Sequence, residues 1–129
     1  MEHEVEISKI IINETVAQQV VVLSEVNGER FFPMVIGMPE ILAIDRRIKG
    51  SKFPRPLTHD LLANLIKEMG GILTRIVITD LKEHTFMANL VIQKEDKVIH
   101  VDCRPSDGLA LGAGLDVKIY VDDRVFDNL

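Results

Sequence analysis

The chain has no tryptophan, one tyrosine and one cysteine among its 129 residues. A single cysteine excludes an internal disulfide and a metal site built on cysteine, and it is typical of a reducing compartment, so we expect a cytoplasmic protein. Cys103 would need a lowered pKa to act as a nucleophile, and a small buried residue at the end of a strand is the simpler interpretation. The scarcity of aromatic side chains leaves few platforms for stacking nucleobases, which argues against a sequence-specific reader of nucleic acid.

The sequence also lacks long apolar runs and several familiar catalytic motifs. No stretch reaches the roughly 20 apolar residues of a transmembrane helix, and the first residues do not resemble a signal segment, so we expect no contact with a membrane. Glycine-rich dinucleotide and phosphate loops, the Gly-x-Ser-x-Gly elbow and cysteine–histidine zinc spacing are absent. With 47% hydrophobic residues, a chain of this length can bury about two-thirds of its unfolded surface. We therefore expect one domain over residues 1–129.

The formal net charge of −5 works against an indiscriminate polyanion binder, because phosphate contacts dominate nucleic-acid affinity. The charge is unevenly distributed, however. Residues 46–55 include Arg46, Arg47, Lys49, Lys52 and Arg55 and contain no acid. This stretch is either the solvated end of a helix or a positive edge that binds an anionic ligand, and the sequence leaves both interpretations open.

Apolar periodicity indicates the secondary structure. The pattern predicts strands over residues 5–12, 18–26, 30–36, 72–80, 85–93, 97–103 and 118–121, and helices over residues 39–49, 58–69 and 107–114. The first three strands form a meander, with a hairpin turn at Asn27-Gly28. We therefore predict an α+β fold in a single domain, with a mixed, largely antiparallel sheet and about three helices.

A faint internal duplication accompanies this pattern. Hairpin-rich strands lead into a helix twice, and residues 40–44 resemble residues 107–111 in their order of acid, apolar residues and alanine. If the halves are related, Glu40 and Asp107 occupy equivalent helix starts, and Arg55 and Arg104 lie near one another on the same face of one cleft. The alternative is that both segments simply open a buried helix.

The most distinctive chemistry of the sequence is a repeated Arg-Pro motif, Arg55-Pro56-Leu57-Thr58-His59-Asp60 and Arg104-Pro105-Ser106-Asp107. Thr58 and Ser106 are favourable N-cap residues, and the aspartates that follow fall in the first turn, where free N–H groups favour negative charge. Each motif therefore predicts a helix start. An arginine beside such a start either helps the free amides to hold an oxyanion or pairs with a nearby aspartate and pins the loop.

These two motifs, in this order, resemble the paired signature of the bifunctional nuclease domain family. The likeness extends to Phe32-Pro33-Met34-Val35-Ile36-Gly37 with Glu40 and Ala43, which resembles the family's first helix entry, and to Thr85-Phe86-Met87-Ala88, which resembles its strand between the motifs. The resemblance covers most of the chain and implies nuclease activity on DNA and RNA.

The sequence departs from the family pattern in its last predicted helix. Gly108, Gly112 and Gly114 stand where relatives usually carry alanine or larger residues, so we expect this helix to be weaker by up to about 1 kcal/mol per interior glycine. Met87 stands where an aromatic residue is common. Neither departure removes an arginine, aspartate or histidine from the signature.

The resemblance and the candidate residues together lead to the hypothesis of a metal-assisted nuclease that hydrolyses phosphodiester bonds of DNA and RNA without strong sequence preference. In this hypothesis a histidine acts as acid or base, arginines clamp the phosphate, and carboxylates hold Mg²⁺ or Mn²⁺. The expected catalytic residues are His59, Asp102, Arg55 and Arg104, the expected metal ligands are Glu40, Asp60, Asp102 and Asp107, and the expected substrate contacts are Arg55, Arg104, Thr58, Ser106, Arg46 and Arg47.

Each candidate also has a structural interpretation. First-turn acids such as Asp60 and Asp107 often only stabilise a helix start and pair with arginine, and His59 suits edge packing on its helix. A structural role is less automatic for Asp102, which ends a strand. The alternative function is a noncatalytic ligand- or protein-binding module that uses the two Arg-Pro helix-start loops, so the sequence leaves open whether the chain is an enzyme. The long apolar strands over residues 5–12 and 18–26 lead us to expect a homodimer.

Overall fold

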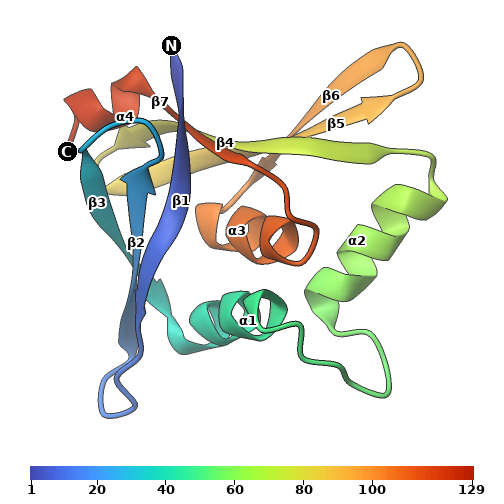
Figure 1. Cartoon of the computed structure of the whole chain (residues 1–129), viewed down its shortest axis with the longest axis horizontal. Coiled ribbons are helices and arrows are strands. Elements are labelled where there is room, and N and C mark those ends of the chain that lie inside the picture. Colours follow the sequence, from blue (N-terminus) through green and yellow to red (C-terminus); the bar gives the residue numbers. More distant parts are fainter.

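The computed structural model describes residues 1–129 as seven strands and four helices (Figure 1). The strands are β1 Glu2–Ile11, β2 Gln18–Glu25, β3 Phe31–Gly37, β4 Ile72–Lys82, β5 Thr85–Lys94, β6 Lys97–Cys103 and β7 Ile119–Asp122, and the helices are α1 Met38–Ile48, α2 Thr58–Glu68, α3 Pro105–Ala113 and α4 Asp123–Asp127. The α+β fold predicted from the sequence is confirmed. None of the helices has the length and hydropathy needed to span a lipid bilayer.

All seven strands belong to one sheet in the order β3-β2-β1-β7-β4-β5-β6. Every neighbouring pair is antiparallel except β4 and β7, so the predicted meander of the first three strands and the largely antiparallel sheet are both confirmed. Three antiparallel strands followed by a helix occur twice, as β1-β2-β3-α1 and as β4-β5-β6-α3. Figure 1 shows these two parts of the sheet facing α3 from different sides.

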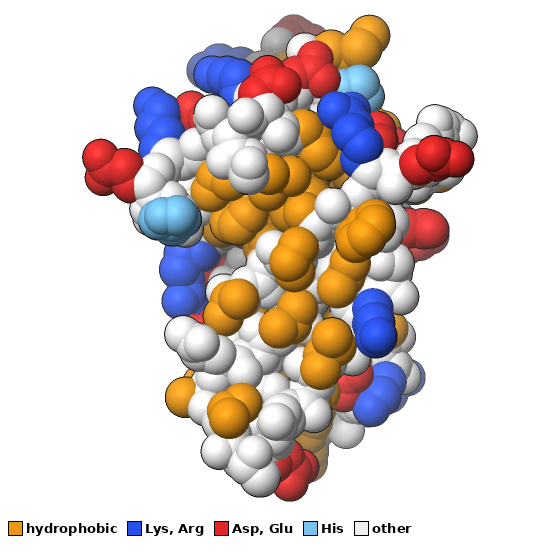
Figure 2. All heavy atoms as spheres, turned by 90° about the vertical axis from the view of Figure 1, so that its left-hand side faces the viewer, with side chains coloured by type: hydrophobic (Ala, Val, Ile, Leu, Met, Phe, Trp, Pro, Cys, Tyr) orange, Lys and Arg blue, Asp and Glu red, His pale blue; other side chains and the backbone are white.

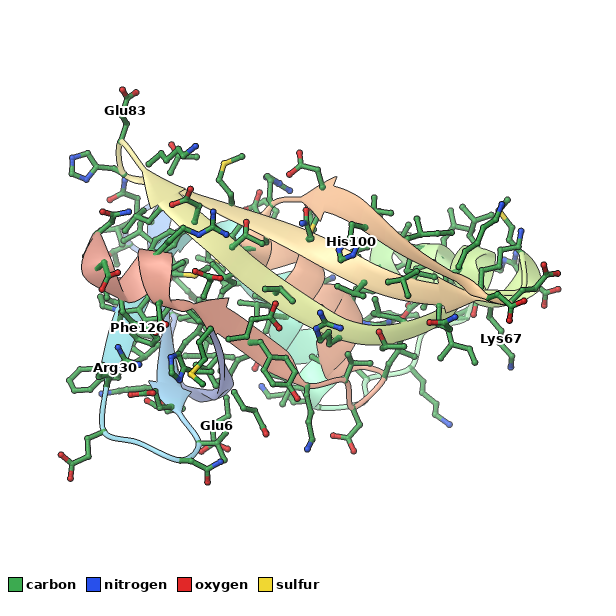
Figure 3. The ribbon with its side chains drawn as sticks, turned by 90° about the horizontal axis from the view of Figure 1, so that it is seen from above. Glu6, Arg30, Lys67, Glu83, His100 and Phe126 are labelled. Carbon is green, nitrogen blue, oxygen red and sulfur yellow. The ribbon has the colours of Figure 1, made fainter.

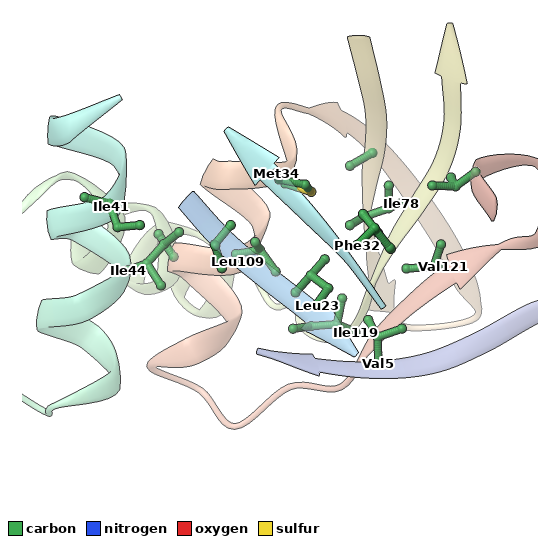
Figure 4. Close-up of a cluster of buried hydrophobic side chains, with 14 residues drawn as sticks. Val5, Leu23, Phe32, Met34, Ile41, Ile44, Ile78, Leu109, Ile119 and Val121 are labelled. Atoms are coloured by element: carbon green, nitrogen blue, oxygen red, sulfur yellow. The ribbon is translucent and has the colours of Figure 1, made fainter. Parts of the chain in front are cut away.

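Helix α3 forms the centre of the core. Its residues Leu109 and Ala110 are completely buried and pack in one cluster with Ile41 and Ile44 of α1 and with sheet residues such as Leu23 (Figure 4). Full burial of one such aliphatic side chain stabilises a fold by roughly 1.5–3 kcal/mol. This burial holds α1 and α3 in place against the sheet, and it thereby sets the positions of their first turns in the structure.

The glycines of α3 allow close packing. A Cβ atom on Gly108 would lie 3.0 Å from Cγ2 of Ile76 in β4, and one on Gly112 would overlap Cδ1 of the same isoleucine. A Cβ on Gly114 would overlap the guanidinium of Arg47. Glycine lowers the helix propensity at these positions. In return, the absence of a side chain allows α3 to approach β4 and α1 closely.

The predicted N-cap residues are wrong by one or two positions. Leu57 precedes α2 and Arg104 precedes α3, so Thr58 is the first residue of its helix and Ser106 the second residue of its own. In α2 the free backbone N–H of Leu57 donates instead to Oδ2 of Asp60, at 3.0 Å. Asp60 therefore supplies one half of a capping box, while no side chain at the N-cap position accepts a hydrogen bond.

Helix α3 begins at Pro105, two residues before the predicted start at Asp107. Proline suits the first helical position because its φ is already helical and the missing N–H would have no partner there. As a result Ser106 lies within the helix and is only 5% exposed.

Helix α4 was not predicted, because five residues are too few to show a periodicity. Asp122 caps it by accepting a hydrogen bond from the backbone N–H of Arg124, at 3.0 Å. Phe126 of α4 packs edge-on against Phe32, and the guanidinium of Arg30 lies 3.8 Å from its ring centroid. Figure 3 shows Arg30 and Phe126 together at one end of the molecule.

Arg47 of α1 joins three helices. Its Nε donates to the carbonyl oxygen of Ala110 at 2.6 Å, its Nη2 donates to that of Leu111 at 3.1 Å, and its Nη1 pairs with Asp60 of α2. Both carbonyls lie in the last turn of α3, where free C=O groups favour a cation. The side chain is only 12% exposed, so these contacts are largely shielded from water.

We predict that Arg47→Met lowers the free energy of unfolding by about 2–4 kcal/mol, because two carbonyl groups lose their guanidinium donor and the Asp60 carboxylate loses its positive partner. Lys49→Met is the matched control, since Lys49 directly follows α1, is 65% exposed and pairs with Asp45 one turn earlier. That control should cost about 0.5 kcal/mol or less. Urea denaturation measures both values, and equal losses in the two variants would contradict the role of Arg47.

Candidate functional site

A cleft of about 570 Å³ opens between α1, the loop that follows it, and the first turns of α2 and α3. This volume falls within the range of small-molecule sites, about 300–1,000 Å³. The lining is mostly polar and consists of Pro39, Glu40, Ala43, Arg46, Arg47, Ser51, Phe53, Pro56, Leu57, Thr58, His59, Asp60, Arg104 and Asp107.

Three carboxylates of the cleft occupy the same position in three helices. Glu40, Asp60 and Asp107 are each the third residue, of α1, α2 and α3 respectively. An acid in the first turn is stabilised by the free N–H groups and the positive end of the helix dipole. The fold therefore gathers the starts of all three helices around one cleft.

Arg104 links two of these acids. Its Nε and Nη2 donate to the two oxygens of Asp107, at 2.9 and 3.2 Å, and its Nη1 donates to Oε1 of Glu40 at 3.2 Å. The hydrogen bond to Asp107 and its charge raise the pKa of Arg104, with Glu40 adding to the effect. Three of the five N–H groups of the guanidinium are used, and the side chain is 64% exposed. Two N–H groups remain for a ligand.

Asp107 also holds His59. Oδ1 of Asp107 lies 3.0 Å from Nε2 of His59, whose side chain is 16% exposed. Burial opposes the ionisation of Asp107, but hydrogen bonds and positive charge from Arg104 and His59 outweigh it and hold the pKa of Asp107 below its ordinary value. An ionised Asp107 favours the form of His59 that carries a proton on Nε2, which leaves the lone pair of the neutral ring on Nδ1.

The expected metal ligands do not form a metal site in this arrangement. No group of three or more histidine, cysteine, aspartate or glutamate side chains converges as ligands for an ion. Arg104 lies between Glu40 and Asp107, and Asp60 is paired with Arg47. Mg²⁺ and Ca²⁺ need several carboxylate, carbonyl or water oxygens around one point, so these acids fit guanidinium partners better than a divalent ion.

The other predicted site residues are distributed differently. Thr58 and Arg46 line the cleft, and Arg46 makes one hydrogen bond, from Nε to the carbonyl oxygen of Leu42 at 3.0 Å, and no ion pair. Ser106 is buried outside the lining, and Asp102 is exposed on the edge strand β6, also outside it. Arg55 is exposed in the loop between two lining residues but does not itself line the cleft.

Sequence reasoning missed the contribution of the loop between α1 and α2. Ser51 and Phe53 of this loop line the cleft, together with Ala43 of α1. One signal was present in the sequence, because Phe53 lies between the cations Lys52 and Arg55 in a stretch without acids. An aromatic residue among basic ones is a common feature of nucleic-acid sites.

Cys103 does not behave as an activated nucleophile. Burial, followed by the negative charges of Asp107 and Asp102, raises the pKa of Cys103 to about 11. The side chain packs against the core cluster of the sheet and α3. It therefore remains a neutral thiol at neutral pH, in agreement with the structural interpretation.

We predict that Asp107→Asn lowers the free energy of unfolding at pH 7 and that this loss disappears in acid. A carboxyl whose pKa is lowered by folding stabilises the protein above its unfolded pKa of about 4, and the stabilisation is lost as the pH falls through the folded pKa. The gap between variant and parent should therefore narrow below about pH 4 in urea denaturation.

Asp102→Asn is the matched control, because it makes the same chemical change five residues away at an exposed side chain. It should change the free energy of unfolding by about 0.5 kcal/mol or less at every pH. A gap between Asp107→Asn and the parent that is the same at pH 3 and pH 7 would contradict the role given to the Asp107 carboxylate.

Comparison with known proteins agrees with the paired motifs at the cleft. The sequence model described as the bifunctional nuclease domain matches residues 21–129. An uncharacterised protein of Mycobacterium tuberculosis strain H37Rv is 41% identical over 122 residues, which cover 95% of this chain and 73% of that protein. Bifunctional nuclease 1 of Oryza sativa subsp. japonica is 20% identical over 112 residues, or 84% of this chain and 34% of the rice protein. The chain belongs to the bifunctional nuclease domain family.

Proposed function

We propose that the cleft hydrolyses phosphodiester bonds of DNA and RNA. The observation that carries the proposal is that one ionised carboxylate, Asp107, holds both a histidine and an arginine at the same cleft. A proton acceptor and a cation for phosphate oxygens are the two parts that this hydrolysis needs most. Membership of the family and the names of its rice relatives support the same chemistry. A cytoplasmic location, expected from the single free cysteine, belongs to this proposal.

His59 is the proposed general base. Its Nδ1 takes a proton from a water molecule, the oxygen of that water forms the new bond to phosphorus, and the bond from phosphorus to a sugar oxygen breaks. The sugar oxygen leaves with a proton from solvent. Asp107 stabilises the imidazolium that forms, because the carboxylate is ionised and lies 3.0 Å from Nε2.

Arg104 and Arg46 are the proposed phosphate ligands. Arg104 keeps two free N–H groups while Asp107 and Glu40 fix the plane of its guanidinium. Arg46 lines the same cleft and has no acidic partner. These residues would contact the phosphate rather than the edge of a base, so we expect little sequence preference.

A second candidate function is a noncatalytic binding module. It is favoured by the observation that all three carboxylates of the cleft are already paired with arginines, while Arg46 in the lining and Lys52 and Arg55 in the adjoining loop have no acidic partner and are free to face an anionic ligand. Such a module would bind an anionic ligand at the helix starts without changing it. Whether cleavage requires Mg²⁺ or Mn²⁺, as expected from the sequence, is tested separately by comparing cleavage with and without a chelator.

We predict that His59→Gln lowers the rate of cleavage about 100-fold and Arg104→Lys at least about tenfold, because the first loses the base and the second loses the planar fork. Asp102→Asn should cleave like the parent, since Asp102 lies outside the cleft. The measurement is cleavage of labelled DNA and RNA single strands by proteins purified in parallel, which controls for contaminating host nuclease.

Three outcomes would contradict this mechanism in different ways. Equal cleavage by all variants would separate the activity from the cleft. Binding without cleavage would favour the noncatalytic module. Complete loss of cleavage with EDTA would restore the metal-assisted mechanism and contradict hydrolysis by His59 alone.

We also propose that the chain forms a homodimer through the outer face of β1, β2 and β3. Phe31 and Val35 of the edge strand β3 are 67% and 59% exposed there. Figure 2 shows apolar side chains gathered on this side of the molecule. A patch of this kind together with an unpaired strand edge is a common site for a second copy.

We predict a dimer at micromolar concentration in light scattering and a monomer for Val35→Lys, because a charge would be buried without a partner in that interface. Val98→Lys is the control, since Val98 is 55% exposed on β6 at the opposite edge of the sheet. A monomeric parent, or the same effect from both substitutions, would rule out this interface.

A further inference from the structure

We propose that the cleft receives single-stranded nucleic acid by stacking one base on the ring of Phe53. The inference rests on the proposed function and deepens it, because it names the form of the substrate and the residue that selects it. No base pair needs to be read in this arrangement, only the face of one unpaired base.

Phe53 is the one phenyl ring in the lining of the cleft, and it is 44% exposed. Two other phenylalanines have different environments. Phe32 is 2% exposed in the core, where it stacks on Phe86 with ring centroids 5.6 Å apart. Phe31 is exposed, but on β3 and outside the cleft lining. The ring of Phe53 is therefore available to a ligand that occupies the cleft.

The loop that carries Phe53 is restricted by its own sequence. Pro54 follows Phe53 directly and Pro56 follows after one intervening residue, and each proline fixes its own φ and limits the conformation of the residue before it. A loop with few alternative conformations loses less entropy when a ligand orders it. The ring of Phe53 therefore lies on a loop that loses little conformational entropy when a ligand binds.

The surroundings of Phe53 favour a polyanion. No acid occurs from residue 46 to residue 59. Arg47 and Lys49 of this stretch are paired with aspartates, whereas Arg46, Lys52 and Arg55 have no acidic partner. Three uncompensated cations on a chain of net charge −5 make this edge the natural place for a phosphate backbone.

The size of the site favours a single strand over a duplex. The open cleft of about 570 Å³ has room for a ligand the size of a small molecule, such as one nucleotide with its phosphate. In a duplex each base is stacked between its neighbours and cannot offer its face to a side chain without being flipped out. An unpaired base offers that face freely, so Phe53 discriminates in favour of single strands.

Tryptophan fluorescence tests the contact directly, because the chain has no tryptophan of its own. We expect the fluorescence of Phe53→Trp to be quenched by octathymidylate with phosphorothioate linkages, which resist cleavage, and not by a blunt-ended DNA duplex, which has no unpaired base. Phe31→Trp is the matched control and should not respond, because its ring lies outside the cleft. Absence of quenching in Phe53→Trp, while anisotropy shows that the octamer binds, would overturn the proposal.

A second variant removes the ring. Phe53→Leu should weaken binding of octathymidylate about tenfold and leave binding of an abasic octamer unchanged, because only the base contact is lost. Phe31→Leu should bind both probes like the parent. Unchanged affinity of Phe53→Leu for octathymidylate, or an equal loss for the abasic octamer, would also overturn the proposal.

These readouts measure binding and not turnover, so they separate this inference from the proposed function. A protein that shows the quenching but does not cleave would lose the proposed hydrolysis and keep the stacking site. A protein that cleaves without quenching would keep the hydrolysis and lose the stacking site.

Discussion

The arrangement of the cleft depends on the guanidinium of Arg47. It donates to two carbonyl groups in the last turn of α3 and pairs with Asp60 in the first turn of α2, while its own backbone belongs to α1. Gly114 is part of the same constraint, because a Cβ atom there would occupy the space of the guanidinium. One largely buried side chain thus sets the relative positions of three helices, and their first turns supply the acids of the cleft.

Every carboxylate of the cleft has a positive partner, but several of the cations in and beside the cleft have no acidic partner. Its three carboxylates are all engaged by arginine, and Asp107 is engaged by His59 as well. The cations exceed these pairs, since Arg46 and the loop residues Lys52 and Arg55 have no acidic partner. A chain with an acidic total charge therefore presents a positive opening, and the net charge alone is a poor guide to what the cleft attracts.

The parts of the fold that follow from local patterns were predictable from the sequence. Alternating residues and the Asn27-Gly28 turn indicate the meander, and apolar residues at helical spacing indicate α2. The pairing of Arg104 with Asp107 could also be predicted from the sequence, because a spacing of three residues at a helix start brings the two side chains together. Helix α4 was out of reach because one short turn carries no periodic signal.

The remaining features depend on contacts between distant segments. Arg47 meets residues more than sixty positions away in the sequence, and nothing in its neighbourhood indicates those partners. Asp102 lies two residues before Arg104 of the second Arg-Pro motif, but its strand is the exposed edge of the sheet and the chain turns into the cleft only after it. The exposure of Phe53 depends on the path of the loop between α1 and α2, and the sequence alone does not specify that path.

Capping and function are not alternatives for the acids of this cleft. An acid in the first turn is stabilised in its ionised form by the helix start, and in that form Asp107 fixes both His59 and Arg104. The same carboxylate that stabilises the helix therefore orients the groups that meet a ligand. A substitution of the acid disturbs both roles at once, whereas a change at His59 or Phe53 leaves the helix start intact. Function in this family member is consequently best tested at the partners of the acids, with the acids themselves as tests of the fold.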